Sequence, residues 1–239
     1  MYYTNDYRNT SGGKMKKIEQ YNAYYKPTFK KTSVERRQKI YDVAIEEFAA
    51  NGYNATNINV IAKKAGISIG SMYSYFDSKE DLFLAIVDMG FSLLETVLKN
   101  VNIEQDSIFD AFESLLRASQ TYALNYPELN QIYLDLTTQG LSVLSEKLSH
   151  KLESTTAEIY KKLIRKAKRE GLVRKEIDEG IASFCLDNLI IMFQFSFTSD
   201  YYKKRMKIFI GKQAANSDED IIQGIMEFIK KALATNNLV

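Results

Sequence analysis

Residues 56–83 read TNINVIAKKAGISIGSMYSYFDSKEDLF, and this stretch decides the fold expected for the first third of the chain. Ile58 and Ile61 recur at helical spacing, and Ala65-Gly66-Ile67 then interrupts the pattern with a tight turn. Ser68 follows the turn and opens a second short helix. The stretch therefore predicts two short helices around a turn, followed by the start of a third.

The residues on either side extend this pattern to a small helical domain. Thr32-Ser33-Val34-Glu35 has the form of a capping box with Thr32 as the N-cap, and Asn51-Gly52 ends that helix. We expect Thr56 to cap the next helix and Asp77-Ser78 to begin a longer one. The apolar positions of these helices predict one core: Ile40, Ala44, Phe48, Ile58, Ile61, Ala62, Ile67, Met72 and Phe76. The domain predicted in this way spans residues 32–80.

A helix pair of this size is one way in which a protein presents a helix to the major groove of DNA. Burial of the core leaves small or polar residues outward on the 68–75 helix, where serine hydroxyls reach base edges and Ile69 meets a thymine methyl. Tyr73, Tyr75 and Lys79 are expected to reach phosphates, as are Thr56 and Lys64. Plain helical bundles also expose Ser, Gly and Tyr, so the spacing alone leaves both interpretations open.

Residues 34–98 resemble the N-terminal domain of the TetR/AcrR family of bacterial transcriptional regulators. The matching pieces are Ile40-x-x-x-Ala44-x-x-x-Phe48, Asn51-Gly52-Tyr53, Ala55-Thr56, the run from Ile61 to Ser68, the run from Gly70 to Phe76, and the run from Ser78 to Leu82. Carried over by position, the resemblance implies one DNA-facing set: Thr56, Ser68, Ile69, Gly70, Ser71, Tyr73, Tyr75 and Lys79. Ile69 departs from the lysine of many members, which affects which operator is read.

Residues 1–31 are expected to be a disordered basic arm. The first 40 residues hold ten basic and three acidic side chains, a net +7 in a chain whose total is +2. A basic head suits contact with a polyanion. The arm either adds contacts to DNA or is an idle solvated tail.

The rest of the chain, residues 81–239, predicts more helices and no strand. We expect helices near residues 106–125, 128–138, 141–170, 178–199, 201–210 and 218–235, so the fold class is all-α, with a larger helical ligand-binding and dimerisation domain after the helix-turn-helix domain. The helix at 181–197, IASFCLDNLIIMFQFSF, is apolar on nearly every face. One core covers only one stripe of a helix. The remainder is covered either by a partner subunit or by a central position within a monomer.

The resemblance implies a two-fold dimer built from a four-helix bundle. The residues expected at this interface lie on the 178–199 and 218–235 helices: Phe184, Leu189, Met192, Phe195, Ile225, Phe228 and Ile229. The family also binds a small apolar or amphipathic molecule in this domain. The residues expected to line such a pocket are Phe112, Leu116, Tyr122, Tyr126, Tyr133, Tyr160, Phe193 and Gln194, for which ordinary core packing is the alternative.

Little in the sequence suggests enzymatic chemistry. His150 lies among polar residues and is expected at the surface, and Cys185 is the single cysteine, so we expect no metal site and no cofactor. The chain has no signal-peptide or membrane-spanning pattern, and we expect a cytoplasmic, nucleoid-associated protein.

These observations predict a homodimeric repressor, not an enzyme, that binds a palindromic double-stranded operator and is released by a small ligand. The alternative is a DNA-bound adaptor that acts through protein contacts without an inducer.

Overall fold

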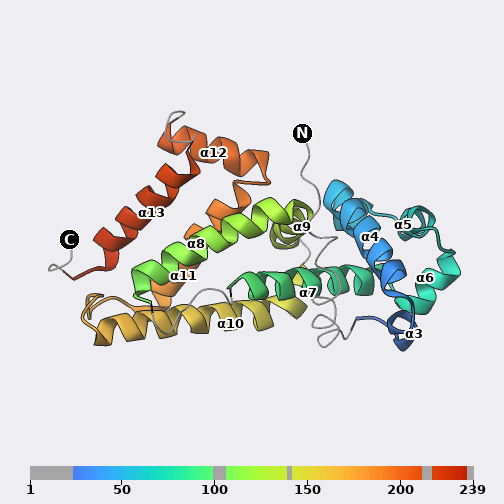
Figure 1. Cartoon of the computed structure of the whole chain (residues 1–239), viewed down its shortest axis with the longest axis horizontal. Helices are drawn as coiled ribbons and strands as arrows, with labels where there is room; N and C mark the ends of the chain where they lie inside the picture. Colours follow the sequence, from blue (N-terminus) through green and yellow to red (C-terminus); the bar gives the residue numbers. More distant parts are fainter. Residues whose placement is uncertain (1–23, 99–105, 139–141, 212–216, 236–239) are drawn as a thin grey trace. The chain divides into compact units, whose positions relative to one another are not determined.

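The structure, a computed structural model, describes residues 24–98, 106–138, 142–211 and 217–235. Its helices follow the chain as α3 (Pro27–Lys30), α4 (Val34–Ala55), α5 (Ile58–Ala65), α6 (Ile69–Tyr75), α7 (Lys79–Leu98), α8 (Ile108–Asn125), α9 (Pro127–Thr138), α10 (Ser142–Arg169), α11 (Glu179–Phe195), α12 (Asp200–Ile210) and α13 (Asp218–Leu233) (Figure 1). Across the described residues the only β-type pairing is an isolated bridge between Val173 and Ala234. The predicted all-α class is confirmed.

The chain forms two compact units. Unit 1 comprises residues 1–94 and 131–139, and unit 2 comprises residues 95–130 and 140–239. Unit 1 therefore extends beyond the boundary predicted after residue 80, because α7 and the later part of α9 cluster with the N-terminal helices.

Local capping residues set the helix ends of unit 1. Ser33 caps α4 by accepting a hydrogen bond from the amide of Arg36, and Asn57 caps α5 by accepting one from the amide of Asn59. The predicted N-caps, Thr32 and Thr56, each lie one residue too early. The helix predicted to end at Asn51-Gly52 is kinked there, where Gly52 has a φ of +70°, and α4 then continues to Ala55.

Residues 24–31, expected to be disordered, are folded as part of unit 1. Pro27 stands at the start of α3, where its missing amide donor costs nothing. Phe29 is fully buried, with its ring centroid 4.7 Å from that of Phe76 and 5.4 Å from that of Tyr41. The expectation of disorder is wrong for this segment because Phe29 completes an aromatic core. The remainder of the predicted arm, residues 1–23, lies outside the described residues.

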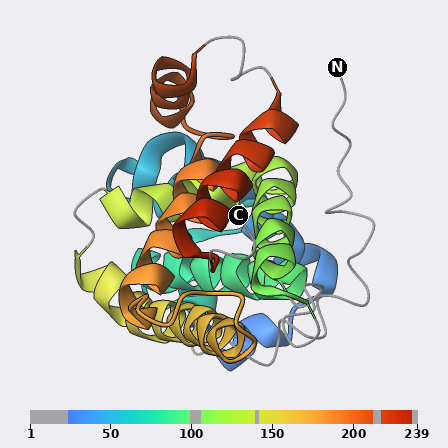
Figure 2. The ribbon, with the colours of Figure 1, turned by 90° about the vertical axis from the view of Figure 1, so that its left-hand side faces the viewer.

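Unit 2 is built around α8. Figure 2 shows the ribbons of α8, α10, α11 and α13 grouped together. One core cluster joins α8 to the other three helices, with Phe112, Leu116, Ile164 and Phe193 all buried. The helix predicted to end at residue 199 ends at Phe195, after which Ser199 caps α12.

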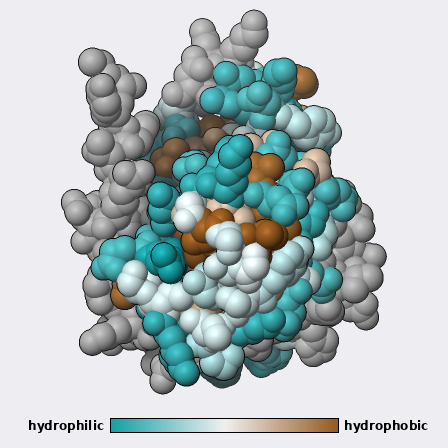
Figure 3. All heavy atoms as spheres, turned by 90° about the vertical axis from the view of Figure 1, so that its right-hand side faces the viewer, coloured by the Kyte–Doolittle hydropathy of each residue, from teal (hydrophilic) through white to brown (hydrophobic). Residues whose placement is uncertain are grey.

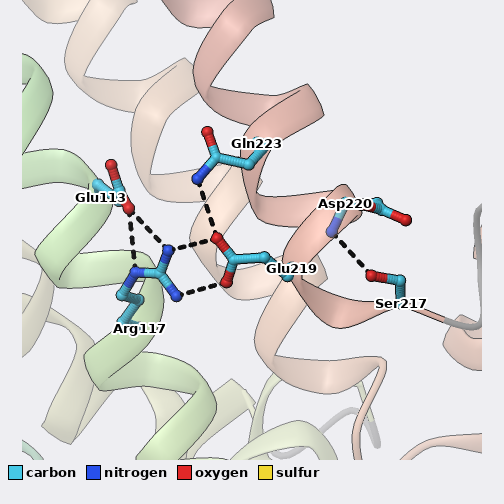
Figure 4. Close-up of polar contacts among 6 residues, drawn as sticks. All are labelled: Glu113, Arg117, Ser217, Glu219, Asp220 and Gln223. Atoms are coloured by element: carbon cyan, nitrogen blue, oxygen red, sulfur yellow. Dashed lines mark hydrogen bonds and ion pairs between the residues drawn. The ribbon is translucent and has the colours of Figure 1, made fainter.

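A charged network fastens α8 to α13 in unit 2. The guanidinium of Arg117 donates to Glu113 on its own helix at 2.7 Å, and to both carboxylate oxygens of Glu219 on α13 at 2.8 Å (Figure 4). These hydrogen bonds from Arg117, aided by one from Gln223, lower the pKa of Glu219 to about 2. A bidentate pair of this kind fixes direction as well as distance between two helices.

Among the described residues, no individual helix combines the length and apolar character that a membrane crossing requires. The pair α11 and α12, bent by 112° at the break between them, meets that requirement only when counted together.

Candidate nucleic-acid interface

The turn between α5 and α6 is fixed by its own backbone. Gly66 ends α5 in the left-handed conformation, with φ of +73°, and its amide donates to Ala62 and Lys63 carbonyls. The Ser68 hydroxyl caps α6 by accepting a hydrogen bond from the amide of Ser71 at 3.0 Å. The two helices therefore form the predicted helix-turn-helix, with the start of α6 held in one geometry.

The two faces of α6 differ sharply in exposure. Met72 is buried, as predicted, on the inner face. The outer face is formed by residues that are exposed to solvent: Ser68, Ile69, Gly70, Tyr73 and Ser74. Ser71 lies at the edge of this face and is half-buried. We call this outer face of small and polar residues the α6 surface.

Figure 3 views the protein from the side on which α5 and α6 are drawn. Hydrophilic side chains dominate this side, and they surround a smaller apolar patch. Exposed apolar side chains on these two helices are Val60 and Ile69, each 37% exposed. A surface of this kind combines polar groups for phosphates with apolar groups for base methyls.

Two residues predicted to face outward are buried, so that part of the prediction is wrong. Tyr75 is only 7% exposed because its ring packs 5.4 Å from Phe29, a neighbour that the sequence pattern did not reveal. Thr56 is 4% exposed, and its hydroxyl donates to the carbonyl of Gly52 at 2.6 Å and lies 3.1 Å from that of Glu47. Thr56 holds the kinked end of α4.

The ammonium of Lys79 is engaged within unit 1. It donates to the carbonyls of Tyr53, Asn54 and Thr56 at 2.8, 3.2 and 3.0 Å, and it lies 4.6 Å from the centroid of the Tyr53 ring. An ammonium has three protons to donate. These contacts tie Lys79 to the last residues of α4, so the predicted contact with a phosphate would draw its ammonium away from three carbonyls.

Lys64 remains at the surface. Its side chain is 58% exposed, and its ammonium lies 2.5 Å from a carboxylate oxygen of Glu47. The hydrogen bond and charge of Glu47 raise the pKa of Lys64. Glu47 is mostly buried, but the Lys64 side chain extends into solvent, so a phosphate can compete with Glu47 for the ammonium.

Sequence reasoning missed three residues that contact α6 from a distant part of the chain. Lys26, Thr28 and Phe29 all reach α6 or the residues that follow it. The available signal was Pro27, a residue common at the first position of a helix, followed two residues later by a single large apolar side chain.

With this geometry, the chain can be compared with known proteins. The family model "Bacterial regulatory proteins, tetR family" matches residues 40–86, which include α5, α6 and the turn between them. The chain is 31% identical over 137 residues to the HTH-type transcriptional regulator QacR of Staphylococcus aureus, an alignment that covers 56% of this chain and 72% of QacR.

The chain belongs to the TetR family of bacterial regulatory proteins. It is a DNA-binding transcriptional regulator, and the helix-turn-helix of this family is formed by α5 and α6.

Solved structures share the fold of this TetR-family chain. A TetR family transcriptional regulator from Chloroflexus aurantiacus superposes with a TM-score of 0.65 at 20% identity, covering 90% of this chain and all of that one. The regulator FadR from Bacillus subtilis, in complex with stearoyl-CoA, superposes with a TM-score of 0.61 at 18% identity, covering 80% and 96%. At these identities the similarity shows the fold alone.

The predicted dimer residues of this TetR-family chain divide into two groups. Phe184 and Phe228 are 68% and 64% exposed, Met192 is 37% exposed, and Leu189 and Ile225 are half-buried. Phe195 and Ile229 are 2% exposed, because they pack inside the chain. The expectation that these last two face a partner is therefore wrong, since helical spacing does not tell which stripe of an apolar helix meets its own core.

The predicted pocket residues fall in both units. Phe112, Leu116, Tyr160 and Phe193 are members of the unit 2 core cluster, and Tyr122 is buried beside Tyr126. Tyr133 belongs to unit 1, where its ring contacts that of Phe91.

Gln194 was expected to offer a polar group to the pocket, but its amide is already paired. It donates to the Asn130 side chain at 2.6 Å, and Asn130 donates in turn to Thr198 at 2.7 Å. Both amides are buried, so this network satisfies polar groups inside unit 2. The side chain of His150, expected at the surface, lies outside the described residues.

Proposed function

We propose that this protein is a homodimeric repressor that binds a palindromic operator and dissociates when a small apolar or amphipathic molecule binds it. In this proposal residues 32–80 read DNA, residues 81–239 dimerise and bind the ligand, and the protein works at the nucleoid. Membership of the TetR family supports DNA binding and transcriptional control.

The α6 surface is the observation that carries this proposal. Ser68, Ile69 and Gly70 lie exposed at the start of a helix whose other face is anchored by the buried Met72. Ser68 and Ser71 share one hydrogen bond between their hydroxyls, at 2.9 Å, which leaves lone pairs available to base edges. We assign Ser68, Ile69, Gly70, Ser71 and Tyr73 to contact with DNA, and Lys64 to a phosphate.

The test begins with sequencing of the DNA fragments that the full-length protein binds. We expect an enriched palindrome, and Tyr73→Ala should weaken binding to it by about tenfold while the helical content stays unchanged. The matched control is Tyr201→Ala, an exposed tyrosine on α12 of unit 2. The absence of any enriched palindrome, or equal losses in the two variants, would contradict the assignment.

Exposed apolar side chains on α11 and α13 support the dimer. Phe184, Met192 and Phe228 leave large apolar area uncovered by the chain, and such area is typical of an interface. A dimer places two copies of α6 about one helical turn of DNA apart, roughly 35 Å. The double variant Phe184→Ser/Phe228→Ser should sediment as a monomer and lose operator affinity, whereas Tyr201→Ser should do neither.

Release by a ligand is supported by FadR, a protein of the same fold whose structure contains stearoyl-CoA. A ligand shifts DNA binding only if it has different affinities for the two states of the protein. Stearoyl-CoA and free stearate are therefore the first probes to titrate into the operator complex, with loss of bound DNA as the expected result.

One observation favours the alternative, a DNA-bound adaptor that acts through protein contacts. Four predicted pocket side chains fill the unit 2 core, and α12 exposes Ile208 and Phe209 at 79% and 74%. An operator affinity that no apolar probe changes, together with loss of regulation on Phe209→Ser, would favour the adaptor.

A further inference from the structure

The C-terminal end of α6 is bound by a segment that lies more than forty residues earlier in the chain. The last four carbonyls of any α-helix lack partners within that helix. With seven residues, α6 is also too short to be stable by itself. Its first turn is capped by its own Ser68, so its last turn is the end that needs outside support.

The segment Tyr25–Thr32 gives that support at three consecutive carbonyls. The amide of Lys26 donates to the carbonyl of Tyr75 at 2.8 Å, and its ammonium donates to the carbonyl of Tyr73 at 2.8 Å. The hydroxyl of Thr28 donates to the carbonyl of Ser74. Three carbonyls at the end of α6 are thus satisfied by two residues of one short segment, which includes the start of α3. Figure 1 shows α3 beside α6.

The positive charge of Lys26 adds an electrostatic interaction to these hydrogen bonds. The ammonium of Lys26 lies 2.6 Å from a carboxylate oxygen of Asp77, directly after α6. A positive charge beside the C-terminus of a helix is stabilised by the helix dipole. Lys26 therefore interacts with the end of α6 both through its backbone and through its side chain.

The segment is itself anchored, so it does not simply follow α6. The buried ring of Phe29 packs against the rings of Tyr75 and Phe76 and also against that of Tyr41 in α4. The guanidinium of Arg37, also in α4, donates to the carbonyls of Lys30 and Thr32 at 2.9 and 2.6 Å. The segment links α4 to the end of α6.

We propose that the segment Tyr25–Thr32 is a clamp that sets the pose of the DNA-reading helix, with Lys26 and Thr28 as positioning residues for operator binding. The clamp lies outside residues 40–86, which match the family model. This inference rests on the proposed role of the α6 surface, because a displaced α6 changes affinity only if α6 reads DNA. Neither Lys26 nor Thr28 needs to touch DNA.

The test compares Thr28→Val, which removes the hydroxyl at almost constant volume, with Thr28→Ser, which retains it. In the full-length free protein, amide hydrogen exchange in Met72–Phe76 should be faster in Thr28→Val and normal in Thr28→Ser. Operator affinity should fall about tenfold in the first variant and recover in the second. Thr121→Val is the matched control, because the Thr121 hydroxyl also donates to a backbone carbonyl, that of Arg117 in α8.

The salt dependence of operator binding separates positioning from direct contact. The slope of affinity against salt should be the same in Thr28→Val and wild type, since no phosphate contact is lost. Lys26→Met should likewise weaken binding and speed exchange in α6, and Lys26→Arg should restore both. A reduced slope in Lys26→Met would overturn the positioning role of Lys26 in favour of phosphate contact.

Unchanged exchange in α6 would overturn the clamp itself. Unchanged affinity despite faster exchange, in a protein whose Tyr73→Ala variant binds more weakly, would overturn the role of the clamp in operator binding, as would a loss of affinity that Thr28→Ser does not restore. The exchange measurement needs no DNA, so it decides the clamp even if the operator assignment fails. Failure of the proposed function is seen separately, as undiminished binding in Tyr73→Ala.

Discussion

Positively charged side chains are used differently in the two units. In unit 1, Lys26, Arg37 and Lys79 donate to backbone carbonyls at the ends of α3, α4 and α6. In unit 2, Arg117 and Arg165 bind carboxylates of neighbouring helices. Each unit has exceptions. In unit 1, Lys26 also pairs with Asp77, and Lys64 pairs with Glu47. In unit 2, Lys166 donates to the carbonyl of Asp106, and Arg174 donates to that of Ala232.

The difference has a physical consequence for each unit. A cation bound to a neutral carbonyl stabilises a helix end without having its charge neutralised, so that charge still attracts a polyanion. A cation bound to a carboxylate forms a pair with no net charge, and the carboxylate titrates in acid. Unit 1 should therefore tolerate acid better than unit 2, and four changes test this comparison, from the largest expected effect to the smallest.

Replacement of Lys79 should have the largest effect. Lys79→Met leaves the carbonyls of Tyr53, Asn54 and Thr56 without their donor and should lower the free energy of unfolding by about 3 kcal/mol. Lys231→Met is the matched control, because Lys231 is exposed and pairs with Glu227 one turn away, and it should cost less than about 0.5 kcal/mol. Urea unfolding followed by circular dichroism measures both, and equal costs would contradict the comparison.

Replacement of Asp187 should have the second-largest effect, and it should stabilise the protein. Burial, together with the charge of Glu153, raises the pKa of Asp187 from 3.8 to about 6. The folded protein then holds this proton more tightly than the unfolded chain, so stability falls as the pH rises from about 4 to about 6. Asp187→Asn should stabilise the protein at pH 7 by about 2 kcal/mol and have no effect near pH 4. A difference in stability between Asp187→Asn and the wild type that does not change with pH would contradict this prediction.

Lys64 provides the third test, because it is a cation of unit 1 that pairs with a carboxylate, that of Glu47. Lys64→Met should shift the midpoint of urea unfolding only slightly, because the Lys64 side chain is largely exposed, although the Glu47 side chain that it pairs with is mostly buried. If its ammonium moves to a phosphate in the complex, the slope of operator affinity against salt should fall by about one. An unchanged slope would remove Lys64 from the interface.

The smallest effect is expected at Glu219. Its pKa is lowered from 4.5 to about 2, chiefly by the hydrogen bonds from Arg117. The stabilisation is therefore complete above about pH 4.5 and is lost as the pH falls toward 2. Between pH 5 and pH 2 the melting temperature of the wild type should fall slightly further than that of Glu219→Gln. Parallel curves would show that the pair adds nothing measurable.

Several of these residues could be interpreted from the sequence, and others could not. Gly66 and Ser68 were predicted correctly because a left-handed turn and an N-cap depend on the backbone within three or four residues. Thr56 and Lys79 were assigned to DNA because both are polar and lie near the helix-turn-helix. Their hydrogen-bond partners, at Gly52 and Tyr53, depend on how α4 ends and on where α7 begins.

The sequence by itself determined the helical class, the turn at Gly66 and the small, exposed start of α6, since each depends on local periodicity and capping. Only the tertiary structure decided that Tyr75 faces inward, that Phe195 and Ile229 are unavailable to a partner, and that Phe29 and Lys26 hold the end of α6. The physical reason is that burial and pairing depend on neighbours far away in the chain, 47 residues in the contact of Lys26 with Tyr73, and no local pattern encodes them.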